Sequence, residues 1–246
     1  MSEKNIRLDI EYDGAGFCGW QIQPDVTTVQ GKIKDAIKKV TGLDVIVYGA
    51  GRTDAGVHAF GQVCNFFIDS KLEPDVYCDA INHYLPNTIL IKESSQVPDS
   101  FDSRRSARWR HYQYIVGRVR SALYINRRWE YKYPLDIDRM NRMAKYLLGN
   151  RDCSTFCTVS SLKENNNCEI ISAGWHEEKE VLYFDIKANR FLHSMVRSIV
   201  GLMIEAGKNK DYLTLENFKD IIKSGDHTRL KKIAPARGLY LVAVGY

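Results

Sequence analysis

The sequence predicts an α+β fold made of two halves, each a ferredoxin-like sandwich in which helices cover one face of an antiparallel sheet. Short segments alternate apolar and polar residues, as strands do, and longer segments repeat apolar residues every three or four positions, as helices do. These segments follow one another in a similar order in both halves of the 246 residues. We therefore expect one domain at 1–104 and a second at 105–246.

The first half begins with a strand, because residues 6–12 alternate in polarity. Val29, Ile33 and Ile37 then mark one face of a helix that ends at Gly42. The remaining elements expected in this half are strands at 45–48, 62–68 and 88–92 and a helix at 75–84. Two helices interleaved with strands form one α+β sandwich.

The second half repeats this order. Asp136 is expected to be the N-cap of a helix over 136–148, with Met140 and Met143 on its apolar face. A further helix is expected over 190–206, ending at Gly207. The other expected elements are strands at 107–117, 169–176, 181–188 and 239–244, a polar turn at 177–179 and a shorter helix at 215–222.

The composition excludes several classes of protein. No segment approaches the roughly 20 apolar residues that a membrane-spanning helix needs, and the first residues lack the apolar core of a secretory signal. The six cysteines contain no CxxC pair, so reduced thiols are expected rather than disulfides or a zinc site. No P-loop, GxGxxG or HExxH motif occurs. We expect a soluble, cytoplasmic protein with no cofactor, no metal and no membrane partner.

Positive charge is concentrated in the segment 104–128. The net charge of the chain is +5, but this segment holds eight arginines and no acidic residue, so the other residues carry −3 (5 − 8). The eight are Arg104, Arg105, Arg108, Arg110, Arg118, Arg120, Arg127 and Arg128. Because the guanidinium group binds phosphate in a bidentate manner, the segment indicates a polyanion partner. A solvated basic surface is the alternative.

The densest group of glycines and polar residues is GAGRTDAGVHAFGQ at 49–62, between two expected strands. Its four glycines permit close approach of a ligand to the backbone, and Arg52, Asp54 and His58 supply polar side chains. Loops between strands commonly carry catalytic residues. A tight turn in which Asp54 bonds its own backbone accounts for the same residues. The composition of the loop leaves both interpretations open.

Five blocks of sequence occur in order along essentially the whole chain. They are EYDGAGFCGWQIQP (11–24) with TVQGKIKDAI (28–37), GAGRTDAGVHAFGQV (49–63), NHYLPNTI (82–89) with FDSRRSARWRHYQYIV (101–116), FLHSMVRSIVG (191–201) and APARGLYLVAVGY (234–246). Together they resemble the blocks of the tRNA pseudouridine synthase A family. The resemblance implies the pseudouridine synthase fold, with a central basic cleft between the halves, and an enzyme that isomerises uridine in tRNA.

The resemblance also implies three catalytic residues. Asp54 occupies the position of the family's essential aspartate, which stabilises or bonds to C1′ when the C1′–N1 bond breaks, or removes a sugar proton to give a glycal. Tyr112 matches the active-site tyrosine in the Arg-x-Tyr-x-Tyr pattern, where it could stack on the base or take the C5 proton. Arg197, in FLHSMVR, matches the arginine that pairs with the aspartate and keeps it ionised and oriented.

Other residues are expected to bind tRNA. Arg52 resembles the loop arginine that fills the space left when the target base leaves the stem, and Leu239 resembles the apolar residue beneath the uracil. His58 either contacts phosphate or caps the loop. The remaining candidates are Arg104, Arg105, Arg108 and Arg110, as part of the basic cleft. Simple core packing is the alternative for Tyr112 and Leu239.

The sequence therefore predicts a cofactor-independent tRNA pseudouridine synthase. The resemblance implies targets at positions 38–40 of the anticodon stem-loop, and a homodimer with one tRNA lying across both subunits. One alternative is a non-catalytic RNA-binding protein on the same scaffold. A second is a carboxylate-based glycoside hydrolase, although such enzymes usually need two acids at one site and the loop offers only Asp54.

Overall fold

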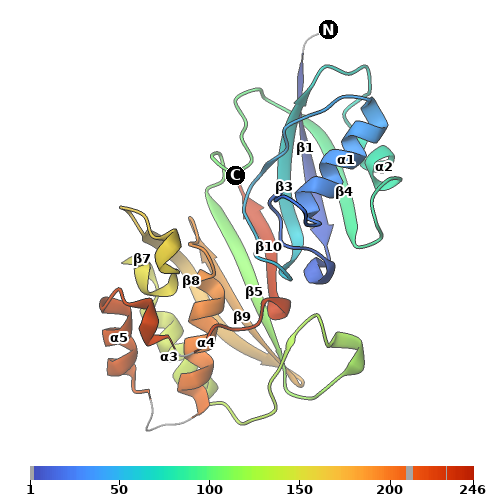
Figure 1. Ribbon diagram of the computed structural model, residues 1–246. Helices are drawn as coiled ribbons and strands as arrows, with labels where there is room; N and C mark the ends of the chain where they lie inside the picture. Colours follow the sequence, from blue (N-terminus) through green and yellow to red (C-terminus); the bar gives the residue numbers. More distant parts are fainter. Residues whose placement is uncertain (1–2, 209–212, 231) are drawn as a thin grey trace. The chain divides into compact units, whose positions relative to one another are not determined.

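The computed structural model describes residues 3–208, 213–230 and 232–246. They divide into two compact units (Figure 1). Unit 1 comprises Met1–Arg108 together with Tyr240–Tyr246, and unit 2 comprises Trp109–Leu239. The end of the chain therefore belongs with its beginning, and each unit contains strands and helices.

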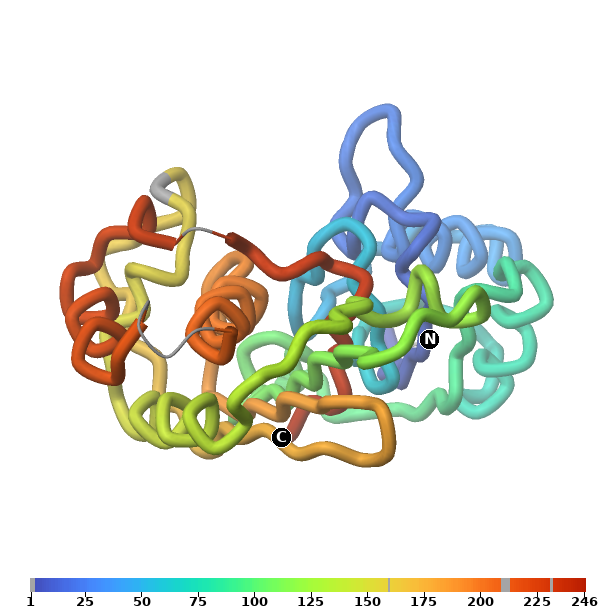
Figure 2. Tube along the Cα trace, turned by 90° about the horizontal axis from the view of Figure 1, so that it is seen from below, coloured from blue at the N-terminus to red at the C-terminus, as the bar shows by residue number. Residues whose placement is uncertain are grey.

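Unit 1 is an α+β sandwich with the strand order β4-β1-β3-β10, in which β2 also pairs with β3. Its strands are β1 (Lys4–Tyr12), β2 (Tyr48–Gly49), β3 (His58–Ile68), β4 (Ile89–Val97) and β10 (Leu239–Gly245). β1 is antiparallel to β3 and to β4, whereas β10 is parallel to β3. Helices α1 (Val29–Thr41) and α2 (Val76–Asn82) lie side by side and cover one face of this sheet (Figures 1 and 2).

Helix α1 begins and ends where its sequence predicts. The Thr28 hydroxyl accepts a backbone hydrogen bond from the first turn, and Gly42 follows the helix in the left-handed region at φ 76°, donating its N–H to Lys38. Ile33 and Ile37 on its apolar face are fully buried. Each such side chain contributes about 1.5–3 kcal/mol relative to leaving it exposed. The predicted helix ending at Gly42 is confirmed.

Unit 2 has the strand order β5-β9-β8-β7, and β6 pairs with β5. Its strands are β5 (Trp109–Gly117), β6 (Trp129–Glu130), β7 (Gly149–Asp152), β8 (Asn167–Glu178) and β9 (Val181–Ala188). β9 is antiparallel to both β5 and β8. The helices are α3 (Ile137–Tyr146), α4 (Met195–Lys208) and α5 (Leu215–Lys223). α3 packs against β8 and against α4 (Figure 1). This arrangement agrees with the predicted α+β class.

Helix α3 follows its sequence closely. The Asp136 carboxylate accepts the Arg139 backbone N–H at 2.9 Å, so the predicted N-cap is confirmed. Met140, Met143 and Ala144 on one face are fully buried.

The predicted limits of α4 were wrong at both ends. The helix begins at Met195 rather than at residue 190, because Ser194 takes a positive φ of 58° that a right-handed helix does not allow. It also continues past Gly207 to Lys208. Gly207 instead permits close packing, since a Cβ there would lie 2.7 Å from the Met140 sulfur. This glycine reflects contact between helices and not the end of one.

Strand limits differ from prediction where pairing with another strand decides them. The strand expected at 45–48 is reduced to β2, and residues 45 and 47 are buried in irregular backbone. β3 starts at His58 instead of residue 62, and β8 includes part of the turn expected at 177–179. β6 and β7 were not predicted. Ladder hydrogen bonds to a partner strand set these limits, and the pattern within one segment does not encode them.

Short 3₁₀ helices connect the longer elements. They are η1 (Gly14–Gly16), η2 (Ala122–Tyr124), η3 (Ser154–Phe156), η4 (Val159–Ser161), η5 (His227–Arg229) and η6 (Ala236–Gly238). In the described part of the chain, no helix has the length and apolar content needed to cross a membrane.

Candidate active site

Asp54 lies on the loop between β2 and β3 in unit 1, and this loop is anchored to β3. The Ala50 N–H donates to the Val63 carbonyl at 2.8 Å. The Gln62 side-chain amide donates to the Gly51 carbonyl, also at 2.8 Å. These bonds satisfy backbone groups that a loop would otherwise leave to solvent, and they fix the path of the chain into Asp54.

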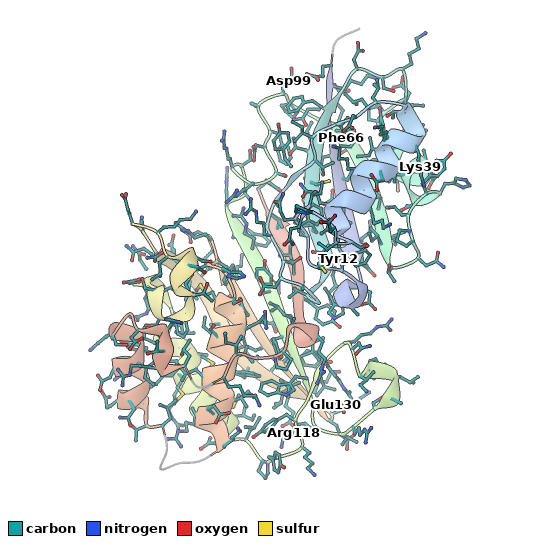
Figure 3. All side chains as sticks on the ribbon, in the orientation of Figure 1. Tyr12, Lys39, Phe66, Asp99, Arg118 and Glu130 are labelled. Atoms are coloured by element: carbon teal, nitrogen blue, oxygen red, sulfur yellow. The ribbon has the colours of Figure 1, made fainter. Side chains whose placement is uncertain are left out.

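Neighbouring side chains of the loop have opposite environments. Thr53 is 7% exposed, and its hydroxyl lies 2.8 Å from the phenol oxygen of Tyr12, which is buried at the end of β1 (Figure 3). Arg52, one residue earlier, is exposed, and Asp54, one residue later, is half-buried. Extended backbone alternates its side chains in this way. The buried Thr53 therefore directs Arg52 and Asp54 away from the core of unit 1.

Residues 13–20 pack against the loop and hold it in place. The backbone N–H of Trp20 donates to the Thr53 carbonyl at 3.1 Å, and the backbone N–H of Gly56 donates to the Phe17 carbonyl at 3.3 Å. Within the loop, the Val57 N–H donates to the Asp54 carbonyl at 3.1 Å. The sequence blocks at 11–24 and 49–63 are therefore two parts of one structure.

Two glycines make this close packing possible. Gly19 has a φ of 86°, and a Cβ at this position would lie 2.6 Å from the Thr53 carbonyl oxygen. A Cβ at Gly14 would overlap the carbonyl of Val57. Only glycine allows the two backbones to approach this closely.

His58, the first residue of β3, is buried with 2% of its surface exposed. Its Nδ1 lies 3.1 Å from the Gly14 nitrogen and 3.1 Å from an Asp13 carboxylate oxygen. Its ring stacks on Tyr240 with centroids 4.6 Å apart, and Tyr240 stacks on Phe60 at 4.8 Å. Of the two roles expected for His58, this burial favours capping of the loop over contact with phosphate.

Tyr112 lies on β5 in unit 2, opposite Ile186 of β9. Its ring is 8% exposed and meets Phe191 edge-on, with centroids 5.0 Å apart. Tyr114 shares the same side of the strand but is fully buried, and its hydroxyl donates to the Pro235 carbonyl at 2.7 Å. Burial raises the pKa of Tyr114. Tyr114 is therefore a core residue, whereas Tyr112 retains a small accessible surface.

Arg197 lies in the first turn of α4 and is half-buried. Its Nε donates to the Ala234 carbonyl at 2.9 Å, and the Ala234 N–H donates to the Arg197 carbonyl at 3.0 Å. A Cβ at Gly201 would overlap the carbonyl of Lys232, so the segment 232–234 runs directly over the helix. This double link holds the arginine side chain in a defined direction.

Leu239 begins β10 and is 6% exposed. It follows Gly238, where a Cβ would lie 2.6 Å from the Tyr114 ring. Leu239 is thus packed tightly in a position that fits either of its expected roles.

The arginines expected to bind tRNA differ in exposure. Arg104, Arg105 and Arg108 have exposed side chains. The backbone N–H groups of Arg104 and Arg105 donate to one Asp102 carboxylate oxygen at 2.9 and 2.7 Å, which fixes the turn that carries both. Arg110 is half-buried, and its Nη1 donates to the Asn189 carbonyl at 3.0 Å.

Arg128 has a structural role within the arginine-rich segment. Its Nη2 donates to the Val119 carbonyl at 2.6 Å, and its guanidinium lies 5.1 Å from the centroid of the Tyr124 ring. A Cβ at Gly117 would overlap this side chain. Arg128 therefore closes the loop between β5 and β6, and the eight positive charges are not equivalent.

The predicted site residues fall into two groups. Arg52 and Asp54 on the loop and His58 at the start of β3 belong to unit 1, whereas Tyr112 and Arg197 belong to unit 2. Sequence reasoning missed the brace formed by Tyr12, Asp13 and Tyr240, although all three lie inside the blocks at 11–24 and 234–246. Within the described residues, no group of three or more His, Cys, Asp or Glu side chains could hold a metal ion.

Comparison with known proteins gives a consistent result. The family model described as tRNA pseudouridine synthase matches residues 10–104 and 143–246. The tRNA pseudouridine synthase A of Caldicellulosiruptor bescii is 41% identical over 245 residues, which cover 99% of this chain and 100% of that protein. The protein of the same name from Brachyspira hyodysenteriae is 40% identical over 240 residues, or 96% of each chain.

Structural similarity adds little to this result. The chain resembles one in the crystal structure of the archaeal box H/ACA sRNP Nop10-Cbf5 complex with a TM-score of 0.36 and 9% identity, covering 94% of this chain and 58% of that one. A similarity of this size carries no argument. The sequence matches extend over both units and include the Asp54 loop, the β5 strand and helix α4. The chain belongs to the tRNA pseudouridine synthase family.

Proposed function

We propose that this protein isomerises uridine to pseudouridine in tRNA and that Asp54 supplies the catalytic carboxylate. Family membership supports the reaction. The anchored loop supports the residue, because buried Thr53 directs the neighbouring Asp54 away from the core of unit 1. A catalytic group must be held in one orientation to act on a bound substrate, and the bonds around Thr53 meet this requirement.

The proposed role of Asp54 follows from the bonds that change. The C1′–N1 bond of uridine breaks, the uracil turns, a C1′–C5 bond forms, C5 then loses its proton, and N1 gains one. Positive charge develops at C1′ in the first step, where a carboxylate either stabilises it or forms a covalent bond. Alternatively Asp54 removes a sugar proton to give a glycal. Both routes need the same ionised carboxylate beside the sugar.

Tyr112 and Arg197 are assigned to the same site on the basis of the family blocks. The nearly buried ring of Tyr112, held edge-on by Phe191, suits stacking on a base, and its phenol suits removal of the C5 proton. Arg197 lies at the N-terminal end of α4, where helix dipole and guanidinium together favour an anionic partner. We propose that this partner is the Asp54 carboxylate.

The tRNA is proposed to be modified at positions 38–40 of its anticodon stem-loop by a homodimer. A paired base must leave its stack before its glycosidic bond can be attacked, and we assign the vacated space to Arg52, which is exposed beside Asp54. Arg104, Arg105 and Arg108 are exposed and suit contact with phosphate. Leu239 is assigned to the surface beneath the uracil.

A pseudouridine map of tRNA tests this proposal. Purified protein is incubated with tRNA from cells that lack the enzyme, and each position is scored for pseudouridine with and without the protein. We expect new pseudouridine at one or more of positions 38–40. Modification only elsewhere would contradict the target assignment, and tight binding without any new pseudouridine would indicate an RNA-binding protein with no catalysis.

A further inference from the structure

An open groove of about 640 Å³ lies on unit 1 between α1 and the turn that follows α2. Residues of α1 form one side, and the Tyr84-Leu85-Pro86 turn forms the other. The turn belongs to the block NHYLPNTI, to which the catalytic proposal assigns no role. Figure 3 labels Lys39 beside helix α1.

The groove is positively charged. Lys32, Lys38 and Lys39 line it, with Asp35 as the acidic residue. Lys38 lies 3.3 Å from Asp44, but neither Lys32 nor Lys39 is within ion-pair distance of a carboxylate in the part of the chain that the structure describes. Lys32 and Lys39 are seven residues apart, which places them on the same side of the helix, about 10 Å apart along its axis. Two such charges suit successive contacts with a polyanion.

An exposed aromatic ring faces the same groove. Tyr84 is 46% exposed, the Lys39 ammonium lies 5.7 Å from its ring centroid, and the His83 ring meets it edge-on at 4.9 Å. Solvated lysines alone would not require an aromatic ring beside them. Basic side chains together with an accessible aromatic face are the combination that binds single-stranded RNA, through phosphates and a stacked base.

Helix α1 connects this groove with the catalytic loop. At its start the Gln30 N–H donates to the Trp20 carbonyl at 3.0 Å, and the Trp20 N–H donates in turn to the Thr53 carbonyl at 3.1 Å. Lys39 is nine residues further along the helix, which corresponds to about 14 Å. The groove therefore runs away from the Asp54 loop along the surface of unit 1.

We propose that the groove binds the sugar–phosphate backbone of tRNA outside the stem-loop that contains the target uridine. Lys32 and Lys39 contact phosphates, and Tyr84 stacks on an unpaired base. The surface thus distinguishes a whole tRNA from its isolated stem-loop. The proposal rests on the proposed function, because the substrate is the same.

The test compares two RNAs and two kinds of variant. Dissociation constants are measured for full-length tRNA and for its anticodon stem-loop with the wild type, Lys32→Gln/Lys39→Gln and Lys34→Gln. Lys34→Gln is the control for loss of a single positive charge from the same helix, because Lys34 pairs with Asp44 at 2.7 Å outside the groove. We expect the double variant to bind full-length tRNA about tenfold more weakly and to lower its salt slope by about two. Binding of the stem-loop should stay within twofold of the wild type.

Tyr84 provides an independent readout. Tyr84→Ala should weaken binding of full-length tRNA by roughly fivefold or more, whereas Tyr84→Phe, which keeps the ring, should bind like the wild type. Circular dichroism confirms that each variant is folded before binding is measured.

Three binding results would overturn the proposal. Unchanged binding of full-length tRNA would show that the groove makes no contact with it, and equal weakening for both RNAs would place the groove within the stem-loop site. An effect of Lys34→Gln as large as that of the double variant would indicate general electrostatics. Failure of the wild type to form pseudouridine would reject the proposed function, while the binding data would still decide the role of the groove.

Discussion

The Asp54 loop and the arginine-rich segment 104–128 are built in opposite ways. In the loop, the Thr53 side chain is buried against Tyr12, and the Thr53 carbonyl accepts a hydrogen bond from the backbone N–H of Trp20. These contacts anchor the backbone on either side of Thr53. In the segment, Arg104 and Arg105 are exposed, and an Asp102 carboxylate oxygen accepts the backbone N–H groups of their turn. A catalytic group that acts on one atom needs an anchored backbone, as in the Asp54 loop. Contact with a flexible polyanion needs exposed basic side chains, as in the segment 104–128.

The difference extends within the segment itself. Arg110 and Arg128 donate to the carbonyls of Asn189 and Val119, and these bonds tie them into unit 2. A count of charges in the sequence treats all eight arginines alike. The structure shows that some of them hold the fold together, so replacing individual arginines should affect stability in some cases and RNA binding in others.

The largest effect is expected at Asp54. Replacing the carboxylate by an amide in Asp54→Asn removes the negative charge that would stabilise the positive charge developing at C1′, but it keeps the shape of the loop. We expect pseudouridine formation to fall by at least about a thousandfold, with the affinity for tRNA within threefold of the wild type. Nucleoside analysis of the tRNA measures the first quantity and a binding titration the second. Activity close to that of the wild type would remove Asp54 from its proposed role.

The second largest loss of activity is expected at Tyr112. Tyr112→Phe keeps the ring packed against Phe191 but removes the phenol, so kcat should fall by roughly a hundredfold if the hydroxyl takes the C5 proton. Steady-state kinetics on tRNA measure kcat and KM separately. Tyr114→Phe is the matched control, because it removes the hydroxyl of a core residue and should change stability while leaving kcat nearly unchanged. A loss of kcat of similar size in both variants would indicate a packing effect.

The third prediction concerns the exposed arginines. Arg104→Ala/Arg105→Ala should weaken binding of every tRNA by about tenfold and reduce the slope of log K against log salt by about two, since two phosphate contacts are lost. Binding titrations at several salt concentrations measure both quantities. An unchanged slope would mean that these two side chains make no phosphate contact.

The smallest effect is expected at the contact between Thr53 and Tyr12, and it concerns stability. Thr53→Val removes the hydroxyl that bonds to the buried Tyr12 phenol, which should lower the free energy of unfolding by about 1–3 kcal/mol. Arg120→Gln, at an exposed position of the arginine-rich segment, should change it by less than about 0.5 kcal/mol. Urea unfolding of both variants measures this contrast. Equal destabilisation would contradict the structural difference between loop and segment.

Much of the fold is readable from local sequence. Helix α1 ends at Gly42, α3 begins after Asp136, and β9 occupies the predicted residues 181–188, because caps and periodicity act over a few positions. The start of α4 was mispredicted, since the pattern of apolar residues continues through Ser194 while its backbone does not. The parallel pairing of β10 with β3 joins residues from opposite ends of the chain, and no local signal encodes it.

The candidate site was predicted from the family blocks more than from residue chemistry. Glycines and an aspartate at 49–62 fit an ordinary turn equally well. What composition does not reveal is the interlocking of that loop with residues 13–20, where Gly14 and Gly19 admit the backbone of Val57 and Thr53. Such contacts join segments far apart in the chain, and they decide which loop residues face inward.

Release of tritium from tRNA labelled at C5 of uridine tests the central claim most directly. Forming the C1′–C5 bond displaces the hydrogen at C5, so the wild-type protein should release one tritium for each pseudouridine formed, with no free uracil. Tight binding of tRNA without release of tritium, or free uracil as the product, would contradict the account.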